Sequence, residues 1–172
     1  MQPNPIVFLD FDGVINTRFY YYENDKLCGK FYHEEDMKVN NIEAINLLNK
    51  LCLKTKSDIV VTSSWRKHKS KNNDFTTKKV LINSGLDSQI NILGDVPILN
   101  TSIGDEVRLW LIENNYPLDH PFIILDDGCD PKEFNDRYIK TSFEEGFTEN
   151  EYLLALDKLN SLLHQKRLFL KK

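Results

Sequence analysis

The stretch that decides the fold is IVFLDFDGVI, at residues 6–15. Four apolar residues in succession precede two aspartates, Asp10 and Asp12, and a glycine follows at which the backbone can turn sharply. A continuous apolar run is typical of a central parallel strand that helices cover on both faces. Open α/β sheets carry their chemistry at the carboxyl ends of such strands. The sequence therefore predicts a buried strand that ends in an acidic site.

The two aspartates of this stretch are one residue apart, so that their side chains lie on the same side of an extended chain. Two carboxylates this close repel each other unless a cation lies between them or one of them is protonated. Asp10 and Asp12 therefore indicate either a divalent metal or a raised pKa. The alternative is a polar turn after the strand, because Asp and Gly are common turn residues.

Strand and helix patterns alternate along the rest of the chain. We expect helices over about 42–54, 74–84, 105–112 and 148–165, and further strands at 58–61, 89–93, 122–125 and 137–141. No internal repeat or linker interrupts this order. The sequence predicts an α/β fold with a doubly wound parallel sheet, as one domain over residues 1–172. A hairpin-like flap at about 16–36, rich in tyrosine, is inserted after the first strand.

The pattern of the first strand returns as PFIILDDG at residues 121–128, where apolar residues again precede two acids and a glycine. Side by side in a parallel sheet, the two strands would bring four carboxylates, Asp10, Asp12, Asp126 and Asp127, to one edge. Four carboxylates gathered there require a cation. A ligand set made only of oxygen atoms favours Mg²⁺ over zinc.

Small hydroxyl residues and a basic run follow the strand predicted at 58–61. Thr62 and Ser63 could donate hydrogen bonds to a phosphoryl oxygen, or they could cap the helix that follows. The run RKHKSK at residues 66–71 could attract a polyanion, whereas most such runs are solvated surfaces. Its position beside the predicted phosphate pocket favours the first interpretation.

Composition limits the class of protein. A hydrophobic content of 41% and a charged content of 28% are ordinary for a globular protein and argue against disorder. The formal charge of −4 provides no global field for nucleic acid. Three irregularly spaced cysteines match neither a zinc motif nor a disulfide framework. With no apolar segment of transmembrane length, we expect a cytoplasmic protein without membrane contact.

Together these motifs resemble the haloacid dehalogenase (HAD) superfamily. DFDGV at residues 10–14 resembles its first motif, Thr62 and Ser63 its second, and Asp126 and Asp127 its acidic fourth. The combination is similar in particular to the HAD domains of Swiss Army Knife RNA repair proteins, as are residues 104–111 and 145–148. The resemblance spans nearly the whole chain, and three motifs in order at three strand ends are fairly specific.

The resemblance implies a phosphatase that forms an aspartyl phosphate. Asp10 would be the nucleophile, and Asp12 the general acid that protonates the leaving oxygen and later activates water. Mg²⁺ would be held by Asp10, by the backbone carbonyl of Asp12 and by Asp127, with Asp126 helping directly or through water. Thr62 and Ser63 would bind the phosphate.

The third superfamily motif provides a lysine or arginine, and here the chain departs from the pattern. A basic residue is expected just before Gly104, where this sequence has Ile103. The basic residues that could bind the phosphoryl group instead are Arg66, Arg108 and Lys132.

Substrate choice in the superfamily depends on cap insertions, and this chain has room only for the flap. A nearly capless site is open, so that it could accept a phosphate at the end of a nucleic acid. It equally permits a phosphoprotein or a small metabolite. A different class of function is a non-catalytic module that binds phosphate and metal without turnover.

Overall fold

The computed structural model describes residues 3–23, 26–30, 37–67 and 76–169, and its centre is a sheet of five parallel strands. Their order across the sheet is β5-β4-β1-β6-β7. The strands are β1 (Ile6–Leu9), β4 (Asp58–Val61), β5 (Ile92–Asp95), β6 (Phe122–Asp126) and β7 (Tyr138–Lys140). The first strand is therefore the middle one, as its continuous apolar sequence predicts.

The register of the sheet aligns the ends of the three central strands. Leu9 of β1 pairs with Val61 of β4 on one side and with Leu125 of β6 on the other. The backbone amide of Thr62 donates to the carbonyl of Leu9 at 2.9 Å, and that of Asp10 donates to the carbonyl of Leu125 at 3.0 Å. The strands β4 and β5 lie on one side of β1, and β6 and β7 lie on the other. The strand order therefore reverses between β1 and β6. This is the place where open α/β sheets bind ligands.

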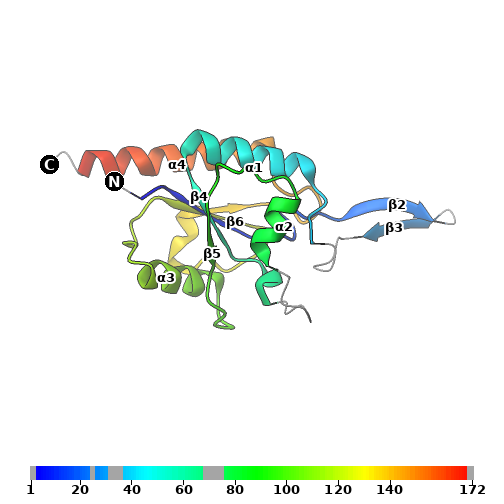
Figure 1. The fold of residues 1–172 in the computed structure, drawn as a ribbon, viewed down its shortest axis with the longest axis horizontal. Helices are drawn as coiled ribbons and strands as arrows, with labels where there is room; N and C mark the ends of the chain where they lie inside the picture. Colours follow the sequence, from blue (N-terminus) through cyan, green and yellow to red (C-terminus); the bar gives the residue numbers. More distant parts are fainter. Residues whose placement is uncertain (1–2, 24–25, 31–36, 68–75, 170–172) are drawn as a thin grey trace.

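Helices cover both faces of the sheet (Figure 1). They are α1 (Ile42–Thr55), α2 (Thr77–Asn83), α3 (Ile103–Glu113) and α4 (Glu149–Phe169). Helices α1, α2 and α4 pack with Val7 and Leu9 in one apolar core, while α3 packs with Ile6 and Phe8 in a second. All four of these β1 side chains are fully buried. The predicted doubly wound α/β fold is confirmed.

The third predicted strand, at 89–93, is wrong in position, because β5 spans Ile92–Asp95. The side chain of Asp87 accepts a hydrogen bond from the amide of Gln89 at 2.8 Å, and its carbonyl accepts one from the amide of Ile90 at 3.1 Å. Asp87 thus holds this segment in a turn, and the strand begins only at Ile92. The helix predicted from residue 105 begins at Ile103, because Ser102 is the residue that caps it.

The flap contains an antiparallel pair of strands, β2 (Phe19–Glu23) and β3 (Lys26–Lys30). This hairpin extends away from the five-stranded sheet (Figure 1). Residues 24–25 and 31–36 of the flap, and 68–71 of the basic run, lie outside the described residues. Within the part of the chain that the structure describes, no helix has the length and apolar character needed to span a membrane.

Candidate active site

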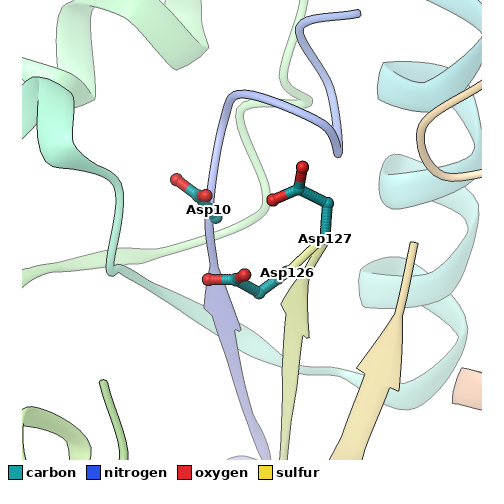
Figure 2. Close-up of side chains that lie close together, drawn as sticks. All are labelled: Asp10, Asp126 and Asp127. Carbon is teal, nitrogen blue, oxygen red and sulfur yellow. The ribbon is translucent and has the colours of Figure 1, made fainter. Parts of the chain in front are cut away.

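Three aspartates meet at the carboxyl ends of β1 and β6. Asp10 directly follows β1, Asp126 is the last residue of β6, and Asp127 follows it. Each offers a carboxylate oxygen within 4.8 Å of those of the other two. Figure 2 shows the three side chains gathered beyond the two strand ends. The repeated motif therefore forms one site from segments more than 100 residues apart.

The electrostatics of this cluster disfavour three negative charges. Removal from bulk water and the nearby Asp126 raise the pKa of Asp10 to about 8. Burial likewise raises the pKa of Asp126, although hydrogen bonds from the amides of Gly128 and Cys129 oppose the shift. Burial and, less strongly, the charge of Asp12 raise the pKa of Asp127. The cluster therefore favours any ligand that brings positive charge.

The chemistry of the donors fits a divalent metal. All three groups offer carboxylate oxygens, which are the ligands that Mg²⁺ prefers, and they converge closely enough to share one ion. The nearby thiol of Cys129 is a poor competitor, because burial and the charge of Asp126 raise its pKa far above the usual range and keep it protonated. The acidic group could therefore hold a metal ion.

A tight turn after β1 brings the two halves of the site together. Gly13 has a φ of +72°, and a Cβ atom added there would lie 2.4 Å from the carboxyl carbon of Asp127. The hydroxyl of Thr141 donates to the carbonyl of Gly13 at 2.6 Å and holds the turn against β7. Only glycine fits this close approach without strain.

Asp12 is placed differently from the other acids. Its Oδ2 atom accepts a hydrogen bond from the indole Nε1 of Trp65 at 2.9 Å, and its Oδ1 accepts one from the side-chain amide of Asn16 at 2.7 Å. Its carboxylate is not part of the group of three that could share a metal. The resemblance implies that Asp12 binds the metal through its backbone carbonyl. The hydrogen bonds from Trp65 and Asn16 involve only the side-chain oxygens.

A cavity of about 330 Å³ lies over the acids and includes all four aspartates in its lining. Thr62 also lines it, and the Thr62 side chain is 2% exposed. Its hydroxyl oxygen has no hydrogen-bond partner among the described residues. Ser63, next in the chain, donates a side-chain hydrogen bond to Asp10. A buried hydroxyl without a partner is costly, and a ligand oxygen in the cavity would satisfy it.

Comparison with known proteins agrees with this arrangement. The model of the family described as "HAD domain in Swiss Army Knife RNA repair proteins" matches residues 6–152. The chain belongs to this family. The matched region runs from the first residue of β1 into α4 and includes all four aspartates of the site. Searches of curated proteins and of solved structures gave no match.

Two of the three basic residues expected to face the phosphate in this HAD domain lie away from the cavity lining, and all three are engaged with carboxylates. Arg66 lines the cavity, but its guanidinium binds the carbonyls of Thr62 and Ser63 and forms an ion pair with Glu106. Arg108 pairs with Glu133, and Lys132 pairs with Asp130 at 3.0 Å.

A different lysine of the HAD domain lines the cavity. Lys67 ends a short 3-10 helix, η2 (Ser64–Lys67), and its side chain is exposed. Among the described residues none forms an ion pair with Lys67. Ile103, which replaces the expected basic residue, lines the same cavity. Lys67 of η2 and Ile103 of α3 thus line one cavity with the acids.

Sequence reasoning did not assign a role to Trp65 or Asn16, the two residues that bind Asp12. Asn16 lies two residues after the first motif, and Trp65 lies two residues after Ser63 of the second. A tryptophan in a 3-10 turn beside a predicted acid could have indicated an indole donor. Nothing in the spacing specifies which carboxylate would accept from it.

Proposed function

We propose that this HAD domain is a Mg²⁺-dependent phosphatase that hydrolyses phosphate monoesters through an aspartyl phosphate on Asp10. The observation that carries the proposal is the convergence of Asp10, Asp126 and Asp127 beneath a cavity. That cavity also holds the hydroxyl of Thr62, which has no hydrogen-bond partner among the described residues. Carboxylates that repel one another, next to buried donors, suit a site for a metal ion together with a phosphate.

The proposed reaction uses two aspartates, in the roles that the resemblance to the superfamily implies. A carboxylate oxygen of Asp10 attacks phosphorus while the bond from phosphorus to the leaving oxygen breaks, and Asp12 gives its proton to that oxygen. Water then attacks the phosphorus of the aspartyl phosphate, Asp12 accepts the proton of the water, and the Asp10 carboxylate leaves with its charge restored. Inorganic phosphate is the product.

The acids that would hold Mg²⁺ are Asp10, Asp126 and Asp127. When bound, the ion supplies the positive charge that offsets the repulsion between an anionic nucleophile and an anionic phosphate. Asp10 reacts as the carboxylate, whereas desolvation and Asp126 favour its protonated form in the metal-free protein. Metal binding and ionisation of Asp10 therefore support each other.

The phosphoryl oxygens would be bound by the hydroxyl of Thr62 and by the ammonium group of Lys67. Both residues line the cavity; among the described residues the Thr62 hydroxyl has no hydrogen-bond partner and Lys67 forms no ion pair. Arg66 contributes by holding η2 in place through Glu106. Ser63 would orient Asp10 through the hydrogen bond between their side chains.

The substrate class that we favour is a terminal phosphate of a nucleic acid. The description of the family names RNA repair proteins, the cavity is open, and Lys67 belongs to the basic run at residues 66–71. Positive charge beside a phosphate site attracts the rest of a polyanion. A small phosphorylated metabolite is the alternative, and it would make no use of this run.

Phosphate release from 4-nitrophenyl phosphate tests the activity. We expect release with Mg²⁺, loss of release in EDTA, and loss in the Asp10→Asn variant. A panel that includes RNA and DNA with terminal phosphates then tests the substrate class. Binding of Mg²⁺ and inorganic phosphate without turnover across the panel would support the non-catalytic module instead.

A further inference from the structure

We propose that Trp65 is a positioning residue for the proton transfer by Asp12, acting together with Asn16. The inference rests on the proposed function, because it gives Asp12 the role of general acid. It adds a residue from the second motif to the proton-transfer step of that reaction. The contacts that carry it are the hydrogen bonds to the two oxygens of the Asp12 carboxylate.

Trp65 is well placed to fix another side chain, because it is itself held firmly. Its side chain is 2% exposed, and its ring packs edge-on against Phe11, with ring centroids 5.5 Å apart and planes at 76°. The next residue, Arg66, anchors the same 3-10 helix to Glu106 of α3 through a buried ion pair. The indole N–H therefore points at Asp12 from a rigid support.

Asn16 approaches Asp12 from a second segment. Its backbone is part of the turn after β1: its carbonyl accepts from the amide of Gly13, and its amide donates to the carbonyl of Phe11, both at 2.8 Å. The two donors thus hold opposite oxygens of one carboxylate. A carboxylate has about four lone-pair directions, so that one remains on each oxygen for a proton. The direction of proton transfer is thereby restricted.

The second tryptophan of the chain provides a matched control. Trp110 is 5% exposed and packs edge-on against Phe8, with centroids 5.7 Å apart and planes at 84°. It lies in the core on the other face of the sheet, away from Asp12. Trp110→Phe therefore removes the same amount of buried ring as Trp65→Phe without removing a donor to Asp12.

The test compares two esters that differ in their need for a proton. Hydrolysis of 4-nitrophenyl phosphate expels a stable anion, whereas phenyl phosphate expels a basic oxygen that needs protonation. We expect Trp65→Phe to lower kcat/KM for phenyl phosphate about tenfold more than for 4-nitrophenyl phosphate. Trp110→Phe should change both alike, and Asn16→Ala should resemble Trp65→Phe. Equal losses on both esters in Trp65→Phe would overturn the inference.

A measurement without turnover tests the contact itself. The chain has two tryptophans, so that its NMR spectrum contains two indole N–H signals, which the two Phe variants assign. Asp12→Ala should shift the Trp65 signal and leave that of Trp110 in place. An unmoved Trp65 signal contradicts the proposed contact. A wild-type chain that hydrolyses neither ester overturns the proposed function and the positioning role together, whereas equal ester losses overturn the positioning role alone.

Discussion

The two ends of the central sheet treat buried carboxylates in opposite ways. At the amino end, Asp58 is 8% exposed, and its oxygens accept hydrogen bonds from the side-chain amides of Asn4 and Asn91. At the carboxyl end, Asp10 and Asp126 face each other, and burial together with their repulsion favours protonation. The first arrangement is satisfied by neutral donors, while in the second burial and the neighbouring carboxylates raise the pKa values of Asp10 and Asp126.

This difference separates a carboxylate that supports the fold from carboxylates that suit a ligand site. A buried carboxylate with amide donors contributes to stability, because its hydrogen bonds replace water. Carboxylates that repel one another lower stability until a cation binds. The acids at the carboxyl end are therefore the ones that a bound cation would stabilise. Substitutions at the two ends should have opposite effects on activity and stability.

The largest expected effect separates Asp10 from Asp58. Asp10→Asn should lower kcat/KM by roughly 10³-fold or more, since the nucleophile is lost. Its stability should hold or rise, because one repelling charge is gone. Asp58→Ala should lower the free energy of unfolding by about 1–3 kcal/mol and leave kcat/KM of the folded protein near the wild-type value. Phosphate release and urea unfolding measure both; an inactive but stable Asp58→Ala protein would contradict the comparison.

The next effect concerns the buried ion pair between Arg66 and Glu106 at the carboxyl end of the sheet. Glu106→Ala leaves the Arg66 guanidinium, 3% exposed, without its counter-charge and should lower the free energy of unfolding by about 3–5 kcal/mol. Glu133→Ala breaks the pair with Arg108, whose side chain is 45% exposed, and should cost about 0–1 kcal/mol. Denaturant unfolding gives both values. Equal losses would show that burial of the Arg66 pair does not set its importance.

Mg²⁺ should stabilise the protein through the carboxyl end alone. At a concentration 100 times its Kd, the ion should raise the free energy of unfolding by about 2.7 kcal/mol, because it binds the folded state. Asp127→Asn should reduce this gain and Asp58→Ala should retain it. Thermal unfolding with Mg²⁺ and with EDTA makes the measurement. If Mg²⁺ stabilises Asp127→Asn as much as the wild-type protein, the metal binds at another place.

The acids of the cluster also predict a pH dependence of the metal-free protein. The pKa of Asp10 is raised from 3.8 to about 8 in the folded state. The folded state thus keeps a proton that the unfolded state loses, so stability is greatest below pH 4 for this group and declines as pH rises to about 8. The slope from Asp10 is at most about 1.4 kcal/mol per pH unit. Urea unfolding in EDTA should show a shallower slope in Asp10→Asn; an unchanged slope would argue against the raised pKa.

The smallest effect concerns the cation that faces the phosphate. Lys67→Ala should raise KM for 4-nitrophenyl phosphate about fivefold, because an exposed charge contributes modestly to binding. Lys54→Ala, an exposed lysine in the last turn of α1, serves as the control. Steady-state kinetics at two salt concentrations should show a smaller salt dependence in Lys67→Ala. A KM that matches the control would remove Lys67 from the phosphate site.

The fold and the acidic half of the site could be predicted because their signals are local. The runs that end in Asp10 and Asp126 show both a buried strand and its acidic end, and parallel pairing then brings them together. The contacts of Trp65 with Asp12 and of Arg66 with Glu106 join residues 53 and 40 positions apart. They depend on how η2 is placed against its neighbours, which no spacing in the sequence specifies.

We propose that Asp10, at the carboxyl end of the sheet, becomes covalently phosphorylated during turnover. Borohydride reduces an aspartyl phosphate to homoserine, so the protein can be treated with borohydride during turnover of 4-nitrophenyl phosphate and Mg²⁺. Mass spectrometry of its peptides then locates the change. We predict homoserine at position 10 in the wild-type protein and its absence without substrate. Phosphate release with no modification, or with homoserine at another aspartate, would contradict the account.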